Sequence, residues 1–419
     1  MHLYEIKRAI KAQLSAQLNP NLKLTNDLKT EFLSEILKLL KRAKVSADQE
    51  QKIARDLMDD LFGFGPIQSL LDDPRVTEIM VNGPMFIFVE VDGRIQETTI
   101  SFDDEVHLYE VVQKIARRAQ VRIDESHPYA DCVINGDTRV NLSIAPIAIG
   151  GPLITIRKPR VDIRDVQDLI RRKTFNENMY HFLWACVQAR LNIMFSGATG
   201  TGKTTILEIF SGYIAENERM ILIEDTPELR IRQKNVARLC VKPANVEGKG
   251  EITLRELFIN SLRMRPNRIL LGEIRGAEAF DYLQALTSGH RGSMAVIHAA
   301  SAKEVGLRLE NLAQLSGLNV PPMVIRQQIA TGLDVIVQLE RLENGERKIT
   351  QITAVSKVLG AQDELQYEDL FIYDHLASLA SQPQIKGCHL STGVIPQFFK
   401  EFEKAGVNVP ISIFTPNQS

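Results

Sequence analysis

The stretch from Ser196 to Thr205 has the residue types and the spacing of a site for a nucleoside triphosphate. Its sequence from Gly197 to Thr204 fits the phosphate-binding loop pattern G-x-x-x-x-G-K-[ST] without a mismatch. Glycines let consecutive backbone N–H groups point into one anion-sized cup, and the helix that follows adds the partial positive charge of its N-terminus. The residues expected to bind ATP here are Gly197, Ala198, Thr199, Gly200, Thr201, Gly202, Lys203, Thr204 and Thr205.

Two side chains of this loop are expected to act on the phosphates directly. Lys203 would reach the β- and γ-phosphates, and the Thr204 hydroxyl would ligate Mg²⁺. The competing interpretation is a glycine-rich turn that fits by chance, which at average composition arises in roughly one in a hundred chains of this length. Residues 192–195 predict a short buried strand and residues 205–210 a helix start, and this context favours the nucleotide site.

Hydrolysis of a γ-phosphate also needs a metal environment, a group that orients water, and cations. Three apolar runs, residues 220–223, 269–271 and 294–297, predict buried strands that end in polar residues. Side chains at the carboxyl ends of strands in a parallel sheet lie beside the ligand crevice. Singly, each acid is more often a solvated strand end and each histidine a core or surface residue, but together they indicate a catalytic site. The polar residues at or beside these ends are Glu224, Asp225, Glu228, Glu273, His290 and His298.

Composition limits the class of protein that surrounds these residues. The chain has 419 residues, 44% hydrophobic and 24% charged, which is typical of a globular protein with two or three domains. A net charge of −2 argues against a dedicated nucleic-acid binder. The four cysteines show no metal-ligand spacing. With neither an apolar signal core at the start nor a run of about 18 apolar residues, we expect a cytoplasmic protein that meets membranes through partners.

The pattern of apolar and turn-forming residues divides the chain into four parts. Residues 1–63 read as a helical bundle, in which Ser46 with Gln49 predicts a capping box. Residues 64–158 read as a small α+β domain with two tight hairpin turns, and residues 159–175 as a linker. Strands and helices alternate from residue 176, which predicts an α/β domain with a largely parallel sheet and helices on both faces, ending in a hairpin and helix extension at residue 419.

Segments along almost the whole chain resemble the TadA/CpaF branch of the type II/type IV secretion ATPase superfamily, which are hexameric motors for pilus assembly and secretion. Many segments in the right order are far more specific than the phosphate loop alone. Besides that loop they are GFGP at 63–66, EIMVNG at 78–83, RIDES at 122–126, RVN at 139–141, ED at 224–225, NVEGKG at 245–250, LRMRP at 262–266, GEIRG at 272–276, SGH at 288–290 and IHA at 297–299.

The resemblance implies a RecA-like P-loop ATPase domain preceded by a PAS-like α+β domain and a helical bundle. It implies an "Asp box" at residues 224–228, an atypical second-motif acid at Glu273 and a "His box" that ends at His298. Arginines of the small domain would clamp the phosphates, and Arg139 and Arg157 match the family positions best. The resemblance also implies nucleotide contacts from Arg275 and His290, and from Arg263 and Arg265 either at their own site or at that of the neighbouring subunit. The chain departs from the family pattern at Arg291 and at Thr226-Pro227.

The function expected from these residues and this resemblance is a ring-shaped ATPase motor. Glu224 would orient or deprotonate water, Glu228 would assist, and Mg²⁺ would be held by Thr204, Glu273 and Asp225, partly through water. His298 would sense the γ-phosphate. The expected partners are five further copies in a homo-hexamer and an inner-membrane platform protein of a Tad/Flp-type pilus or a type II/IV secretion system, with extension or retraction left open.

Two other classes of function remain as alternatives. A ring translocase on DNA would need a basic channel, which the overall charge does not favour. A nucleotide-gated scaffold that does not hydrolyse ATP would not need the acids at the strand ends. An ATPase assay with and without DNA separates all three classes.

Overall fold

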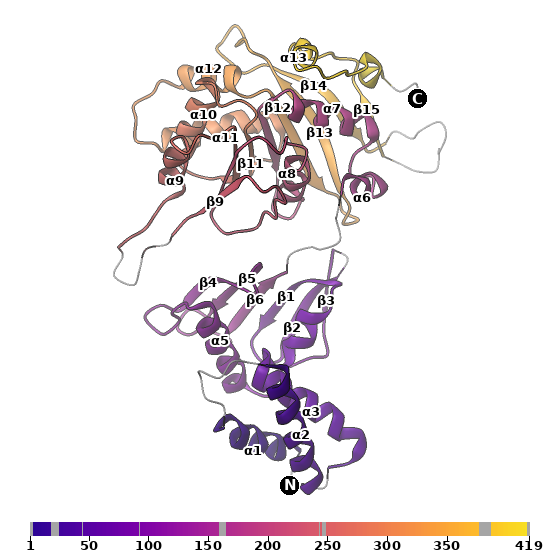
Figure 1. The fold of residues 1–419 in the computed structure, drawn as a ribbon, viewed down its shortest axis with the longest axis vertical. Helices are drawn as coiled ribbons and strands as arrows, with labels where there is room; N and C mark the ends of the chain where they lie inside the picture. Colours follow the sequence, from indigo (N-terminus) through magenta and orange to yellow (C-terminus); the bar gives the residue numbers. More distant parts are fainter. Residues whose placement is uncertain are drawn as a thin grey trace. The chain divides into compact units, whose positions relative to one another are not determined.

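The structure is a computed structural model that describes residues 3–17, 25–43, 45–91, 93–158, 165–242, 244, 249–376 and 387–416. The chain forms two compact units, Met1–Val161 and Asp162–Ser419, which Figure 1 draws in indigo to purple and in magenta to yellow. Separate hydrophobic clusters fill the two units.

Three helices begin the first unit: α1 (Leu3–Ser15), α2 (Asn26–Arg42) and α3 (Ala47–Phe62). Residues spaced three or four apart, among them Ile36, Leu40 and Leu57, are fully buried where the helices pack. The Ser46 hydroxyl donates a 3.0 Å hydrogen bond to the Gln49 side chain. Within the described residues the Ser46 side chain makes no bond to the backbone of α3, so the predicted capping box does not form.

The first unit also contains a six-stranded antiparallel sheet with the strand order β3-β2-β1-β6-β5-β4. On β1, β5 and β6, alternate residues such as Ile79, Val140 and Ile156 are buried against one core, so one face of the sheet is apolar and the other polar. The elements are η1 (Gly65–Ile67), α4 (Gln68–Asp72), β1 (Val76–Asn82), β2 (Phe86–Val91), β3 (Arg94–Glu97), α5 (Glu105–Ala119), β4 (Tyr129–Ile134), β5 (Thr138–Ser143) and β6 (Leu153–Arg157).

Buried charges connect helices α1, α3 and α5. The His107 imidazole lies 2.9 Å from Asp60 and 3.3 Å from Asp103. The Lys7 ammonium lies 3.5 Å from Asp60 and 3.3 Å from Asp103. Lys11 adds a pair with Glu110 at 2.8 Å. Burial lowers the pKa of His107, but its hydrogen bonds to the two aspartates outweigh burial, and the net pKa is raised above the usual 6.5.

A nine-stranded sheet forms the centre of the second unit, in the order β15-β14-β13-β12-β7-β11-β10-β8-β9. The six strands from β12 to β9 are parallel, and the remaining three continue the sheet antiparallel. The strands are β7 (Ile193–Gly197), β8 (Met220–Glu224), β9 (Val236–Cys240), β10 (Arg268–Ile274), β11 (Met294–Ile297), β12 (Val335–Arg341), β13 (Arg347–Val355), β14 (Tyr367–Asp374) and β15 (Cys388–Ser391).

Helices cover both faces of this sheet, because its central strands are buried on both sides. One face packs against α6 (Val166–Arg171), α7 (Glu177–Gln188), α8 (Lys203–Ser211) and α13 (Phe399–Lys404). The other packs against α9 (Leu254–Ser261), α10 (Glu278–Thr287), α11 (Ala302–Gln314) and α12 (Pro322–Gly332). In the described part of the chain, no helix combines the length and the apolar composition that a membrane crossing requires.

Part of the segment expected to be a linker is folded. Residues 159–164 lie outside the described residues, but α6 follows them directly. Asp165 caps α6 by accepting a 3.0 Å bond from the Asp168 N–H, and Val166 and Leu169 are buried in the core of the second unit. The linker prediction was therefore wrong from residue 165 onward, because two apolar residues at helical spacing are enough to dock one short helix.

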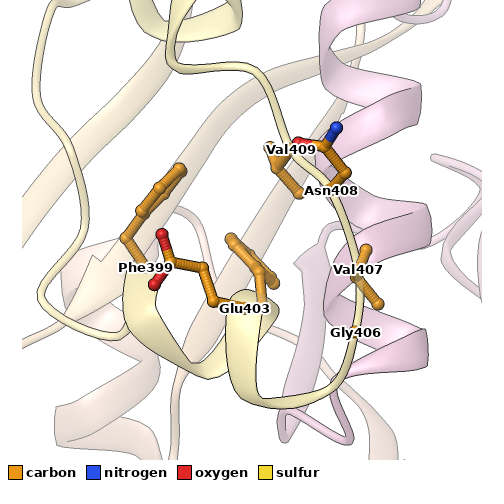
Figure 2. Close-up of a pocket in the computed structure, with 7 residues that line it drawn as sticks. Phe399, Glu403, Gly406, Val407, Asn408 and Val409 are labelled. Carbon is orange, nitrogen blue, oxygen red and sulfur yellow. The ribbon is translucent and has the colours of Figure 1, made fainter.

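The C-terminal extension packs on α7 through a cluster of phenylalanines that includes Phe182, Phe402 and Phe414, and the 3₁₀ helix η2 (Ile411–Phe414) contributes to it. Beside this cluster lies a small pocket of about 250 Å³. Figure 2 shows Phe399 and Glu403 on α13 and the returning segment 406–409 that encloses the pocket. All of its lining residues belong to the extension, and none of them is an expected site residue.

The charge network around His107 predicts that the packing of α5 against α3 depends on pH. A folded-state pKa above 6.5 means that this group's contribution to stability is fully present below pH 6.5 and is lost as pH rises through the folded pKa. Hydrogen bonding to His107 lowers the pKa of Asp103 to about 2, so that contribution persists down to acid pH. Protection of α5 amides from hydrogen exchange, relative to intrinsic rates, should fall above neutrality. His107→Gln should remove this pH dependence, and an unchanged profile would contradict the prediction.

Candidate active site

Glycines shape the loop between β7 and α8 because no other residue fits its backbone. Gly197 has a φ of 148°, and a Cβ there would lie 2.3 Å from the Leu339 carbonyl oxygen on β12. Gly200 and Gly202 adopt φ values of 76° and 98°, in the left-handed region that favours glycine. Helix α8 begins at Lys203, directly after Gly202. The N–H groups of its first turn therefore lie at the loop, as anion binding requires.

The Lys203 ammonium is held at the mouth of this loop. It donates hydrogen bonds of 2.9 Å to the Gly197 carbonyl and 2.7 Å to the Ala198 carbonyl. Thr201 donates from its hydroxyl to the same Ala198 carbonyl at 2.9 Å. A cation among backbone groups and a helix N-terminus fits a polyphosphate, which supports ATP as the ligand of the loop.

Glu224 ends β8 and is buried against the neighbouring strand β10. One of its carboxylate oxygens accepts 2.8 Å hydrogen bonds from the Glu228 and Leu229 N–H groups. A Cβ at Gly272 would lie 3.1 Å from the Glu224 Cγ, so glycine lets this side chain lie over β10. Burial raises the pKa of Glu224 above its usual 4.5, and the two N–H bonds oppose that rise. A carboxylate of raised basicity is suited to accept a proton from water.

Glu273, on β10, and His298, directly after β11, lie together at the same edge of the sheet. The His298 Nε2 lies 3.4 Å from a Glu273 carboxylate oxygen, and the two side chains are 34% and 37% exposed. Burial, and next the positive charge of Lys203, lower the pKa of His298 below its usual 6.5, while Glu273 opposes them. Both influences favour the neutral form of the His298 imidazole.

Oxygen donors for a magnesium ion are present at this edge. The Thr204 hydroxyl follows Lys203 at the start of α8, and the Glu273 carboxylate is accessible. Hydroxyl and carboxylate oxygens are the ligands that Mg²⁺ prefers, so the residues present fit the ion. Asp225 is paired with Arg275 at 2.5 Å, which leaves it better placed for a contact through water than for direct ligation.

Three residues expected at the nucleotide lie elsewhere in the second unit. His290 precedes β11, and Arg263 and Arg265 precede β10, so all three lie at the amino ends of these parallel strands. Lys203, Glu273 and His298 lie at the carboxyl ends. The structure therefore does not bring His290, Arg263 or Arg265 to the phosphate loop of their own chain. These residues are close in sequence to catalytic motifs, but that closeness does not determine which end of a strand a residue occupies.

Arg139 and Arg157 belong to the first unit and lie directly opposite each other on β5 and β6. The Arg157 guanidinium is also 3.8 Å from Glu78 on β1. The sequence suggested each arginine separately, but only strand register shows that they are neighbours. The unexpected residue of the site is Arg347, whose guanidinium donates a 2.7 Å bond to the Gly200 carbonyl from 147 positions further along the chain. No local pattern marks it, because Arg347 opens an ordinary hairpin strand.

Arg291, where the sequence departs from the family pattern, has a structural role at the amino ends of the strands. It lies 3.7 Å from Glu401 of α13 and 4.0 Å from the buried Asp334. Lys357 makes the closer pair with Asp334, at 2.6 Å. Arg291 thus links this turn to the C-terminal extension and leaves the catalytic edge unchanged.

Strand order defines the class of protein. The loop strand β7 and the strand of Glu273, β10, are separated by one inserted strand, β11, and Glu224 follows on β8. This strand order is that of a RecA-like P-loop ATPase. The phosphate loop with Lys203 and the strand-end glutamates on two neighbouring strands belong to the same class of protein. The predicted α/β fold class, with helices and a small α+β region before the ATPase domain, is confirmed.

Comparison with known proteins specifies the family. The family model described as "Type II/IV secretion system protein" matches residues 60–370, and the chain belongs to this family. It is an ATP hydrolase of the type II/IV secretion ATPases, as the sequence segments predicted. The match extends from the first unit into the second, so both units contribute to the family pattern.

Individual relatives agree with this assignment. The chain is 32% identical over 312 residues to a Mycobacterium tuberculosis (strain CDC 1551 / Oshkosh) protein named for conjugal transfer, covering 73% of this chain and 88% of the relative. It is 30% identical to the type IV secretion system protein VirB11 of Bartonella henselae, covering 68% and 90%. Among solved structures it is similar to the VirB11 ATPase of Brucella suis, with 28% identity, a TM-score of 0.38, and coverage of 68% and 91%.

The two glutamates of the Asp box, Glu224 and Glu228, should differ in their effect on turnover. Glu224→Gln keeps the size of the side chain but removes the buried carboxylate, and should slow ATP hydrolysis at least ~100-fold while ATP binding remains. Glu228→Gln is the matched control and should be mild, because Glu228 contributes its backbone N–H to Glu224. Lys203→Ala should abolish hydrolysis, and it gives the background rate of a loop that lacks its cation. Phosphate release and nucleotide binding are the measurements, and a severe Glu228→Gln beside a mild Glu224→Gln would refute the choice of base.

Proposed function

We propose that the chain is a cytoplasmic, hexameric motor that hydrolyses Mg·ATP to drive a Tad/Flp-type pilus or a type II/IV secretion apparatus through an inner-membrane platform protein. The observation that carries the proposal is that the family match spans residues 60–370 and so includes both the sheet with the two arginines and the ATPase site. The name of the Bartonella relative, a type IV secretion system protein, supports a function in secretion.

The residues at the sheet edge divide the chemistry between them. Glu224 orients an attacking water and accepts its proton, since burial makes its carboxylate more basic. Thr204 and Glu273, with Asp225 through water, would hold Mg²⁺, and the ion would supply positive charge to the phosphates. His298, which lies 3.4 Å from Glu273, would register whether a γ-phosphate is present.

Arg139 and Arg157 supply the cations that the transition state still requires. Like charges directly opposite each other repel across a sheet, and the Arg157 guanidinium also lies 3.8 Å from Glu78. A polyanion such as a triphosphate would relieve the repulsion, since Arg guanidinium groups bind phosphate in a bidentate manner. We therefore assign these two arginines to the phosphates of bound ATP.

A ring accounts for the residues at the other edge of the sheet. In a head-to-tail assembly, each subunit presents one surface to a different surface of the next. Arg263, Arg265 and His290 are at the opposite edge from their own phosphate loop, so they are available to complete a neighbour's site. Arg275, by contrast, lies after β10 at the catalytic edge of its own subunit.

Removing either arginine of the first unit should impair chemistry more than folding. Arg139→Ala and Arg157→Ala should each lower turnover by ~10³-fold, the scale of arginines that stabilise a phosphoryl-transfer transition state. Lysine should restore little, because it lacks the planar fork. Arg94→Ala, at the exposed start of β3 in the same sheet, is the control. Near-normal turnover of both alanine variants, measured with thermal unfolding, would mean that the first unit acts only in docking partners.

Assembly can be tested independently of the arginines. A site completed by a second subunit should make ATPase activity rise faster than linearly with protein concentration, and light scattering should report a hexamer. Full activity from a monomer would contradict the ring. Stimulation by DNA, measured in the same assay, would favour the translocase alternative over the secretion motor.

A further inference from the structure

The hairpin of β12 and β13 lies directly beside the phosphate loop. Strand β12 runs parallel to β7, with Leu339 in register with Gly197. The Leu339 carbonyl oxygen would be 2.3 Å from a Cβ at Gly197, so the loop begins in close contact with β12. The turn that follows is closed by a 2.8 Å bond from the Leu342 N–H to the Glu346 carbonyl. Strand β13 therefore starts, at Arg347, at the same edge as the loop.

Arg347 contacts the loop at two places. Its Nε donates a 2.7 Å hydrogen bond to the Gly200 carbonyl. Its Cδ would be 3.3 Å from a Cβ at Gly202, so the aliphatic stem lies against the end of the loop. The side chain is half-buried, which reduces the number of other conformations open to it. Arg347 thus covers the part of the loop from Gly200 to Gly202.

This contact fixes a peptide group of the loop. A trans peptide points its C=O and its N–H in opposite directions. With the Gly200 carbonyl turned toward Arg347, the N–H of Thr201 points away from the guanidinium. Glycine in the left-handed region has little intrinsic preference for this orientation over others. The bond from Arg347 supplies the preference that the Gly200 backbone, at φ 76°, lacks.

Lys203 and Arg347 hold the loop in different ways. Lys203 bonds the Gly197 and Ala198 carbonyls with the same ammonium that must reach the phosphates, so it has to exchange those bonds when ATP binds. Arg347 comes from the hairpin, and its bond uses the Gly200 carbonyl and none of the N–H groups that phosphates need.

We propose that Arg347 is a positioning residue for ATP hydrolysis: it keeps the Gly200–Thr201 peptide group oriented so that the loop presents its N–H groups to the phosphates. The same contact ties the nucleotide site to the antiparallel end of the sheet, because Arg347 is the first residue of β13. A preorganised loop favours every nucleotide with a β-phosphate equally, so Arg347 should act on affinity more than on the chemical step.

The test is to separate binding from turnover in full-length variants. Arg347→Ala should raise the KM for ATP and the Kd for ADP in parallel, by roughly tenfold, as expected for losing a charge-assisted hydrogen bond, while kcat stays within about threefold. Arg347→Met keeps the stem against Gly202 and should show the same loss, which excludes a packing effect. Arg347→Lys keeps a donor and a charge and should recover much of the affinity.

Arg341 provides the matched control, since it faces Arg347 across the hairpin and carries the same charge. Arg341→Ala should leave the ADP affinity near that of the wild type. An equal loss in Arg341→Ala would assign the effect to net charge and overturn the proposal. Unchanged ADP affinity in both Arg347→Ala and Arg347→Met, or a fall in kcat at constant KM, would overturn it as well. Circular dichroism verifies that each variant is folded.

Discussion

The parallel register around β7 is the constraint on which the site depends. Gly197 is aligned with Leu339 of β12, and Ser196 with Ile297 of β11. Because neighbouring parallel strands end at the same level, groups from distant parts of the chain meet at one edge of the sheet. The close approach of the Leu339 carbonyl to Gly197 leaves no space for a side chain, so the sequence of the loop and the position of β12 depend on each other.

The site combines charges whose environments pull in different directions. Burial makes Glu224 more basic while two backbone N–H groups keep it oriented. His298 is pushed toward its neutral form by burial and by Lys203, and Glu273 holds it in place. The loop itself is held by cations from two sides, Lys203 and Arg347. A polyphosphate that enters such a site meets donors already in position, so less reorganisation accompanies binding.

The first unit also contains charged side chains that lie close together. Its buried network of His107, Asp60 and Lys7 connects three helices, and every charge in it has an opposite partner. The polar face of its sheet instead carries Arg139 and Arg157 directly opposite each other. Opposite charges in contact stabilise a fold, and two guanidinium groups close together suit a polyanion. We assign the arginine pair to ATP because both residues lie on the polar face of the sheet, whereas His107 and Asp60 are buried.

Local patterns in the sequence were sufficient for much of the fold and for the centre of the site. The loop from Gly197 to Thr204, the acids after apolar strands, and the hairpins could be predicted, because turn chemistry and strand periodicity act over a few residues. The family resemblance followed from the order of such segments. Where a prediction concerned only neighbours in the chain, it failed mainly at fine detail, as at Ser46, whose hydroxyl bonds a side chain instead of the helix backbone.

Tertiary structure decided which residues from distant segments meet. Strand direction placed His290, Arg263 and Arg265 at the edge away from their own phosphate loop, although each is close in sequence to a catalytic motif. Strand register made Arg139 and Arg157 neighbours and brought Arg347 to Gly200 across 147 positions. Two apolar side chains docked α6 in a segment that otherwise reads as a linker. The sequence by itself determined the chemical groups and their local conformations, whereas their meeting depended on packing between strands, which no short pattern encodes.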